Sequence, residues 1–538
     1  MRKDYEIVGS YNNQRILNID SERNVNLFEY IDINGKRPKT LIPTSGLDIQ
    51  KATFQDALKG VRAAFYFKDI TANNTSHIEG VYVVVGNQFY IIKPDFSVDK
   101  LNPSPLATDT GYVGIDANQH QVMFVDGING YIFNVQTGIF TVKNSSDPFT
   151  PPNIAFPIRP IDVSNLDGYF VIASGDTPNW YISELNNGLV ITAFASITSH
   201  PGNIVACRTL HRRLFLFSEF FTEVWENAGL GSDIPFRRNN TLLMEVGTPS
   251  VGSISTGFDR MFFLSQTRDG LDSIIKVRGY EPIPVSNKAL DYQLSQYDAF
   301  ILTGTKDARG IVIKENGLIF YRINFTNANH TFVLNVSMSS PQDPKWHEEE
   351  VLNGDRHPAQ VHFFFRGNNY YGHYNLPIIY KVNPNNSTNN GETIRRMRIG
   401  KPITPEGYNR LRIDRFHLDL VQGIVETELG EETELLQENG SFSIDTESGI
   451  PLITEVDLTQ FRDHQPVVFL SYSKDGGRNY GNELIAPMGK IGERTFRTVW
   501  RKLGTIPRGQ SFVPRIQFFH QIPFIILGAA WDFEIMPE

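Results

Sequence analysis

The chain has 538 residues, with 38 Phe, 21 Tyr, 43 Gly and 30 Pro, and a formal net charge of −9. This aromatic and turn-rich composition is typical of all-β proteins and excludes a disordered chain. The negative charge argues against a protein that wraps DNA, since such proteins are basic. Cys207 is the single cysteine, so no internal disulfide can form, and its apolar neighbours favour a buried core thiol.

The first residues contain no apolar segment of the kind found in signal peptides. Because no internal disulfide can form, we expect folding in a reducing compartment. The longest uncharged apolar stretch begins at Ile522 and is too short to span a bilayer, so we expect no membrane-spanning segment. Residues 1–45 contain three short extended runs and end in a turn-like Pro-Thr-Ser-Gly sequence. They predict an N-terminal extended arm that supplies an outer strand to the last blade of the repeat region described next, or reaches another domain.

Residues 46–393 contain a repeated pattern of an apolar run, a polar break that usually holds Gly, Asn or Asp, and a second apolar run. This pattern predicts two short strands joined by a turn. Consecutive copies begin about 40 to 55 residues apart, a period that fits a four-stranded blade. The copies begin at Val81, Gln121, Gly168, Arg213, Arg260, Ile311 and Val361.

Burial favours a β-propeller of six or seven blades for this region. An isolated hairpin with two apolar runs cannot cover both of its faces, whereas blades arranged in a circle cover one another. A solenoid is the main competing fold, but its repeats usually contain a helix. No copy here shows a clear 3.6-residue apolar period.

Residues 394–538 follow an Asn-rich linker and return to strand-like alternation. They predict a separate antiparallel β-domain, sandwich-like, with an acidic insertion near residues 425–449. We interpret the insertion as a solvated loop rather than a binding site. The fold class predicted for the whole chain is therefore all-β, a propeller with an additional C-terminal β-domain.

No nucleotide-binding or hydrolase motif is present, and we expect no cofactor, metal or catalytic residue. His357 and His362 are five positions apart, which is poor spacing for metal ligands at the start of a strand. Residues 473–480, Ser-Lys-Asp-Gly-Gly-Arg-Asn-Tyr, resemble the Asp-box of sialidases. We expect a turn in which Asp475 caps backbone amides and the glycines adopt positive φ.

Basic residues cluster at three places in the C-terminal third of the chain. In strands they would alternate with apolar residues and give solvated faces, which is the simpler interpretation. The alternative is a stripe that faces a DNA backbone or an acidic partner. The candidates for such a stripe are Arg395, Arg396, Arg398, Lys401, Arg494, Arg497, Arg501 and Lys502.

Several segments, in the same order along the chain, resemble the phage stabilisation protein family, the packaged-DNA stabilisation or tail-nozzle proteins of short-tailed phages. These segments are residues 23–28, 43–47, 211–217, 222–225, 235–236, 247–250, 262–265, 279–282, 285–287, 346–348, 473–477, 489, 500–504 and 508. The acidic insertion and some longer loops depart from the family pattern.

The resemblance implies a virion structural protein of the tail, assembled in the host cytoplasm, without catalytic residues. It implies a ring-shaped homo-oligomer, usually a hexamer, that retains packaged DNA below the portal and connector and later provides the exit channel. Implied partners are the chain itself, connector or adaptor and portal proteins, tail fibre, spike or needle proteins, and passing double-stranded DNA.

Two other classes of function remain open at this point. One is a carbohydrate-active or glycan-binding propeller, sialidase-like or lectin-like, for which Asp126, Glu223 and Asp269 are candidate carboxylates. The other is a protein-interaction propeller of a host cell. Neither has a motif beyond fold analogy, which is a weak guide to function.

Overall fold

The structure is a computed structural model of the chain. It describes residues 2–15, 20–32, 38–50, 52–68, 79–146, 154–229, 234–270, 273–301, 304–404, 409–422, 466–489 and 496–536. The chain divides into two compact units. Unit 1 comprises Met1–Ser10, Ile16–Thr44 and Thr393–Glu538, and unit 2 comprises Tyr11–Arg15 and Ser45–Glu392.

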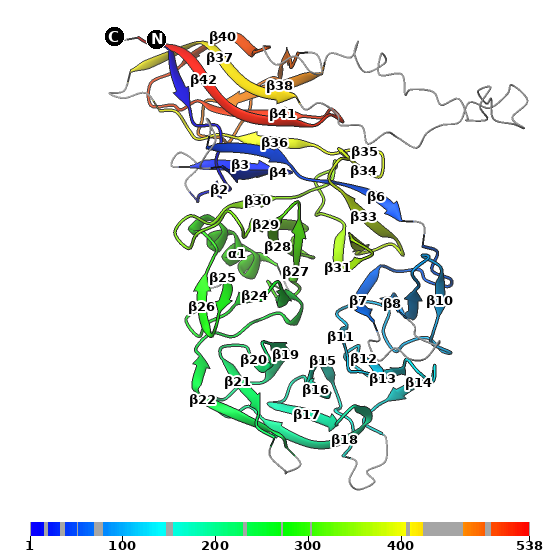
Figure 1. The fold of residues 1–538 in the computed structure, drawn as a ribbon. Helices are drawn as coiled ribbons and strands as arrows, with labels where there is room; N and C mark the ends of the chain where they lie inside the picture. Colours follow the sequence, from blue (N-terminus) through cyan, green and yellow to red (C-terminus); the bar gives the residue numbers. More distant parts are fainter. Residues whose placement is uncertain are drawn as a thin grey trace, which may run out of the picture. The chain divides into compact units, whose positions relative to one another are not determined.

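Unit 2 consists of antiparallel four-stranded sheets set in a circle, which we call blades (Figure 1). The described residues form seven of them, five as separate sheets and two as parts of larger sheets. Blades 1 to 3 are β7 (Val61–Phe67), β8 (Gly80–Val85), β9 (Gln88–Ile92), β10 (Val98–Lys100); β11 (Gly114–Ala117), β12 (Gln121–Val125), β13 (Gly130–Asn134), β14 (Phe140–Lys143); and β15 (Pro160–Leu166), β16 (Tyr169–Ser174), β17 (Asn179–Glu184), β18 (Asn187–Ser196).

The remaining blades follow in chain order, except for the last strand of blade 7. Blades 4 and 5 are β19 (Ile204–Leu210), β20 (Arg213–Ser218), β21 (Thr222–Asn227), β22 (Phe236–Met244); and β23 (Ser255–Gly257), β24 (Arg260–Ser265), β25 (Ser273–Arg278), β26 (Glu281–Pro284). Blades 6 and 7 are β27 (Arg309–Glu315), β28 (Leu318–Phe325), β29 (His330–Asn335), β30 (Trp346–Glu348); and β31 (Ala359–Phe365), β32 (Asn368–His373), β33 (Ile379–Asn383), β6 (Gly46–Gln50).

The seven repeats found in the sequence each correspond to one hairpin, so the predicted propeller is confirmed. The first five repeats form the two middle strands of blades 1 to 5, as in β8 and β9. The last two form the two inner strands of blades 6 and 7. The apolar runs mark these strands because the middle of a blade is covered on both faces.

Neighbouring blades bury each other's faces, as the burial argument requires. Every residue of β8 and of β12 is buried. Phe89 of blade 1 packs on Phe124 of blade 2 with 4.6 Å between ring centroids, in a cluster that also contains Val84 and Val122. Burial of an aromatic side chain of this size contributes about 1.5–3 kcal/mol.

Blade 7 is completed by a strand from the start of unit 2. Strand β6 pairs with β33 in antiparallel register from Ile379 opposite Gln50 to Asn383 opposite Gly46. Gly46 lies so close to the carbonyl oxygens of Thr388 and Asn386 that a Cβ there would collide with them. The circle of blades is thus joined by pairing between residues more than 300 positions apart.

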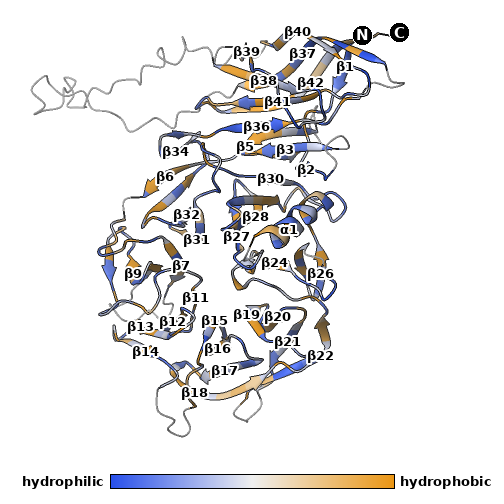
Figure 2. Ribbon diagram, turned by 180° about the vertical axis from the view of Figure 1, so that it is seen from behind, coloured by the Kyte–Doolittle hydropathy of each residue, from blue (hydrophilic) through white to orange (hydrophobic). Residues whose placement is uncertain are grey.

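One helix departs from the sequence analysis, which predicted strands throughout. Helix α1 (Lys288–Phe300) lies between blades 5 and 6, and Figure 2 shows both hydrophobic and hydrophilic residues along it. Asn287 caps its first turn by accepting a hydrogen bond from the Leu290 N–H at 2.9 Å. Its buried residues include Ala289, Leu290 and Leu294, an apolar stripe too short to stand out among the strand patterns.

Unit 1 contains two antiparallel sheets. The first is β4 (Leu27–Ile31), β5 (Lys39–Pro43), β42 (Phe524–Met536), β37 (Arg410–Gln422) and β40 (Thr498–Ile506), with β1 (Arg2–Tyr5) on β42. The second has β3 (Ser21–Val25), β36 (Arg396–Ile399), β41 (Val513–Phe518), β38 (Val467–Ser473) and β39 (Leu484–Pro487) in that order. Their apolar side chains share one core, including Phe416 and Trp500 from the first sheet and Leu470 and Ile516 from the second. The predicted sandwich-like architecture is confirmed.

The three-part division at residues 45 and 393 stays a prediction. In the structure, β1, β3, β4 and β5 of the first 44 residues belong to the same compact unit as the C-terminal strands. The acidic insertion near residues 425–449 lies outside the described residues. Within the described ranges, no helix is both long and apolar enough to cross a membrane.

Candidate basic surface and central cavity

Arg398, one of the candidates for a basic stripe, is buried in unit 1. Its Nε donates a hydrogen bond to the Ile7 carbonyl at 2.6 Å and its Nη1 donates to Asn24 Oδ1 at 2.8 Å. Its Nη2 forms an ion pair with Glu22. Burial raises the pKa of Glu22 above its ordinary value, and Arg398 counteracts this by stabilising the carboxylate. This burial argues against the predicted DNA-facing or partner-facing role for Arg398.

Arg396 is also buried, with 1 % of its surface exposed. Among the described residues, its Nε and Nη1 have no hydrogen-bond acceptor, and its guanidinium lies 5.9 Å from the centre of the Phe524 ring. Burial lowers its pKa to about 10. Strand β36 pairs with β3 at one edge and β41 at the other, and all four of its residues are buried, which argues against a DNA-facing or partner-facing role for Arg396 as well.

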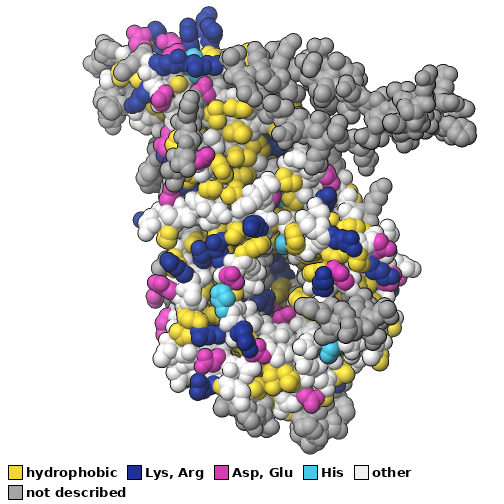
Figure 3. Space-filling model, in the orientation of Figure 1, with side chains coloured by type: hydrophobic (Ala, Val, Ile, Leu, Met, Phe, Trp, Pro, Cys, Tyr) yellow, Lys and Arg dark blue, Asp and Glu magenta, His cyan; other side chains and the backbone are white. Residues whose placement is uncertain are grey.

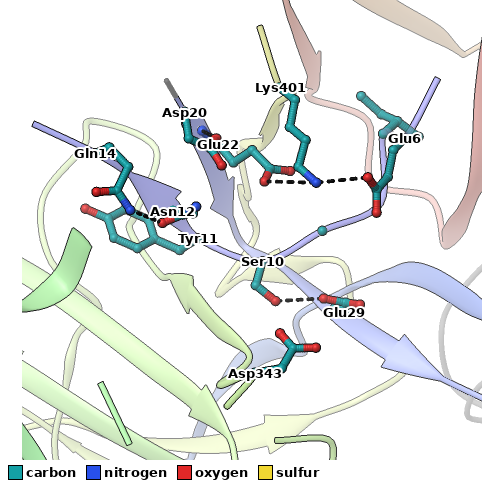
Figure 4. A network of polar contacts seen from close by, with 12 residues as sticks. Glu6, Ser10, Tyr11, Asn12, Gln14, Asp20, Glu22, Glu29, Asp343 and Lys401 are labelled. Atoms are coloured by element: carbon teal, nitrogen blue, oxygen red, sulfur yellow. Dashed lines mark hydrogen bonds and ion pairs between the residues drawn. The ribbon is translucent and has the colours of Figure 1, made fainter. Parts of the chain in front are cut away.

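Lys401 is half-exposed and lies between two carboxylates of unit 1, 2.9 Å from Glu6 and 4.0 Å from Glu22 (Figure 4). Burial lowers the pKa of Lys401, but the hydrogen bond to Glu6 and the charge of Glu22 produce a net increase. In the same view Ser10 donates a hydrogen bond to Glu29 at 2.7 Å. Lys401 is therefore neutralised locally rather than presented as a free cation.

The exposed members of the predicted set lie around β40. Arg497, Arg501 and Lys502 are exposed, and Arg497 lies 3.9 Å from Asp419 of β37. Arg395 is half-buried, and Arg494 lies outside the described residues. The structure thus separates the predicted set into buried structural arginines and a small exposed group, whose contact with DNA or a partner stays a prediction.

Residues 473–480 form the expected capped turn. Asp475 Oδ1 accepts hydrogen bonds from the backbone N–H groups of Arg478 at 3.1 Å and Asn479 at 2.9 Å. Gly476 and Gly477 have φ values of 78° and 96°. Hydrogen bonds from Asn479 and Ser473 lower the pKa of Asp475 to about 2. The turn is a structural element of unit 1.

The turn should add a pH-dependent contribution to the stability of unit 1. Because the pKa of Asp475 is lower in the folded chain than its ordinary value, its contribution is complete above about pH 4 and is lost as the pH falls toward 2. We expect the melting temperature of Asp475→Asn to fall less than that of the parent chain between these pH values. Calorimetric scans of both chains across this range provide the measurement, and parallel curves would contradict the assignment.

The three carboxylates considered for glycoside chemistry do not share a site. Asp126 caps the turn between β12 and β13 by accepting from the Ile128 and Asn129 N–H groups. Glu223 is buried in β21, where it accepts hydrogen bonds from neighbouring groups of blade 4. Asp269 lies in an exposed turn of blade 5. Asp126 and Asp269 therefore lie in turns, and Glu223 lies in the core of blade 4.

His357 and His362 belong to a buried polar region between blades 6 and 7. Glu349 Oε2 accepts a hydrogen bond from Arg322 Nε at 2.9 Å. The same oxygen lies 2.6 Å from Arg322 Nη2. His357 Nε2 lies 3.8 Å from Glu349, whereas His362 contacts Asn369 at 3.0 Å. Burial lowers the pKa of His357 to about 3, so this ring is neutral at physiological pH.

Glu349 is the central carboxylate of this region. Burial alone would raise its pKa, but Arg322 and the neighbouring histidines hold the pKa well below its usual range. The guanidinium of Arg322 also lies over the Tyr371 ring, 4.7 Å from its centre. In the part of the chain that the structure describes, no group of three His, Cys, Asp or Glu side chains is arranged to hold a metal ion.

A cavity of about 410 Å³ lies at the centre of the blades and was not predicted from the sequence. Residues of the innermost strand of every blade line it, including Arg62 of β7, Arg208 of β19 and Arg309 of β27. Figure 3 shows Lys and Arg side chains inside the central hollow. The available signal was a single arginine in each of three strands, β7, β19 and β27, which is weaker than the clustered arginines of the C-terminal region.

The sequence matches a known protein family over most of unit 2. Residues 56–387, more than half of the chain, match the phage stabilisation family model described as the β-propeller of bacteriophage P22 Gp10. The chain belongs to this family. Residues 432–533 match a second model, described as the β-sandwich of bacteriophage P22 Gp10. The resemblance to the phage stabilisation protein family noted in the sequence is therefore confirmed.

Two solved structures that are similar to the chain are distant from it in sequence and in fold. Virginiamycin B lyase from Staphylococcus aureus is 10 % identical, with a TM-score of 0.40, over 63 % of this chain and 99 % of that one. The WD40 β-propeller domain of Doa1 is 12 % identical, with a TM-score of 0.35, over 62 % and 97 %. Likenesses this distant carry no argument about function. No curated protein matches the sequence.

Proposed function

We propose that the chain is a virion structural protein, a tail nozzle or hub subunit without enzymatic activity. It forms a ring below the portal and connector, retains packaged DNA and provides its exit channel. The observation that carries this proposal is the match of two successive regions, in order, to the propeller and the sandwich of bacteriophage P22 Gp10. The absence of converging carboxylates among Asp126, Glu223 and Asp269 supports a structural rather than a glycosidic role.

The charge distribution is compatible with a DNA exit channel. Each phosphate contact adds counterion-release affinity and therefore hinders the movement of DNA along the channel. The chain carries a formal net charge of −9, and two of the predicted arginines, Arg396 and Arg398, are buried. A chain in which 59 acidic residues outnumber 50 basic ones can surround DNA without holding it tightly.

The proposed partners are further copies of the chain, usually six in the ring, the connector and portal proteins, and tail fibre, spike or needle proteins. We expect the purified chain, mixed with its portal and connector, to form particles with a mass several times 61.0 kDa. Light scattering coupled to size-exclusion chromatography measures this mass. A chain that stays monomeric in the mixture, or that hydrolyses fluorogenic glycosides, would contradict the proposal.

The exposed basic group around β40 provides a more specific test. If Arg501 contacts DNA or an acidic partner in the ring, Arg501→Glu should lower particle assembly or DNA retention by about tenfold, since charge reversal adds repulsion. Arg278→Glu, a reversal at an exposed position of blade 5, is the matched control. The melting temperatures of both variants should equal that of the parent chain. Unchanged assembly and DNA retention in Arg501→Glu would remove β40 from the proposed contact surface.

A further inference from the structure

The cavity at the centre of the blades contains three arginines in different chemical situations. Arg62 uses all five of its N–H donors on oxygens inside unit 2. Nε donates to Gly111 O at 3.2 Å, and the two terminal nitrogens donate to Gly86 O and to three oxygens of Thr108 and Thr110. Arg62 therefore adds positive charge to the cavity but offers no donor to a ligand.

Arg208 is neutralised by a neighbouring carboxylate. Its Nη1 pairs with Asp162 and also donates to the Cys207 carbonyl at 2.7 Å. Its Nη2 donates to the Tyr112 hydroxyl. Asp162 is fully buried. Its ion pair with Arg208 therefore links the innermost strands of blades 3 and 4 and leaves no net charge for a ligand.

Arg309 differs from the other two because no acceptor contacts it among the described residues. Its guanidinium lies over the Tyr112 ring, 4.7 Å from the centre. Gly252 makes room for it, since a Cβ at this position would lie 2.5 Å from Arg309 Nη1. The side chain is half-buried and lines the cavity. Its hydrogen-bond donors are thus available on the cavity wall.

The charges around Arg309 are not balanced by the cavity's carboxylates. Asp116, an acid of the cavity lining, accepts hydrogen bonds from the Ala117 and Asn165 N–H groups at 2.8 and 2.7 Å. Burial lowers the pKa of Arg309 to about 10, and Arg62 acts in the same direction. The charge of Asp307 raises the pKa of Arg309, but no carboxylate of the described residues forms an ion pair or a hydrogen bond with the Arg309 guanidinium. Arg309 is therefore a partly desolvated cation at neutral pH whose donors are open to an anion.

We propose that the central cavity binds a small oxyanion, a phosphate or a carboxylate group, on Arg309. A guanidinium presents paired N–H donors that match the oxygens of either group. Hydroxyl groups of Thr209 and Ser255 and the amide of Gln360 also line the cavity and can serve the rest of such a ligand. The cavity volume of about 410 Å³ admits a small molecule and excludes a nucleic-acid strand or a folded partner.

Titration calorimetry on the full chain tests this proposal, with sodium phosphate and sodium acetate as separate probes and sodium chloride at matched ionic strength as the reference. We expect saturable binding of phosphate, acetate or both, and the two probes distinguish the preferred oxyanion. Binding of that probe to Arg309→Gln should be at least about tenfold weaker. Arg268→Gln, in an exposed turn of blade 5, should bind like the parent chain.

A second variant keeps the test decisive if Arg309→Gln does not fold. Gln360 Oε1 accepts a hydrogen bond from Arg356 Nη1 at 3.1 Å, and Gln360→Glu preserves this contact while it adds a negative charge to the cavity wall. We expect this variant to melt like the parent chain and to lose affinity for the oxyanion. Equal affinity in Gln360→Glu or Arg309→Gln, or no binding beyond chloride, would overturn the proposal.

Discussion

Replacement of Glu349 by Gln is expected to lower the free energy of unfolding of unit 2 by about 3–5 kcal/mol, the cost of leaving one member of a buried ion pair without its partner. Glu349 and Arg322 are both buried, and the carboxylate accepts two contacts from the guanidinium. The variant preserves shape and removes only the charge. Urea denaturation followed by circular dichroism measures the loss, and hydrogen exchange of peptides from blades 6 and 7 locates it in unit 2.

The double variant Arg322→Met/Glu349→Leu tests whether the loss of stability comes from the unpaired charge of Arg322. Apolar side chains of similar size remove both charges together, so we expect it to recover most of the lost stability. Glu281→Gln, in the exposed part of β26, is the control for the chemical change itself and should unfold like the parent chain. The interpretation fails if Glu349→Gln unfolds at the same urea concentration as the parent.

The second large effect concerns Arg398, where structural and DNA-binding roles make opposite predictions. Arg398→Met should destabilise unit 1 by about 3–5 kcal/mol, because it leaves the Glu22 carboxylate buried without its counter-ion. A DNA-facing arginine, by contrast, could be replaced without loss of stability. Thermal and urea unfolding, with hydrogen exchange of peptides around β3 and β36, measure the difference.

The pH dependence of Arg398→Met gives an independent check. Without Arg398, the pKa of Glu22 rises further, because burial is then opposed mainly by Lys401. A folded-state pKa above the unfolded value favours the folded chain at low pH, and this advantage is lost as the pH rises through the folded pKa. The deficit of the variant should therefore be smallest near pH 4 and should grow toward neutral pH. Arg501→Met, an exposed change, should show no such trend.

The sequence predicted the parts of the fold that depend on local pattern. Runs such as the one from Val81 alternate with turn residues, and the strands they form are covered on both faces, so apolar composition and strand position coincide. Pairing across long distances was not predictable in this way. Strand β6 is assigned to blade 7 by its register with β33, and no local feature of residues 46–50 specifies that partner.

The candidate sites were predicted less well for a related reason. The arginines of residues 395–398 looked like a solvated face because each alternates with an apolar residue, but β36 lies between two strands and is buried throughout. Arg309 did not stand out in the sequence, because it begins its strand and the next basic residue of that strand is Lys314, five positions later. Only the closure of the blades places it beside Arg62, which is about 250 positions away.

The pairing of β6 with β33 has a consequence for biosynthesis. When a ribosome has made residues 46–50, their partner at 379–383 does not yet exist, so the nascent chain carries an unpaired strand through the synthesis of all the intervening blades. Such an edge is a template for pairing with other chains, and slow non-local closure prolongs its exposure. Each nascent copy is therefore open to pairing with other chains until residues 379–383 have been made.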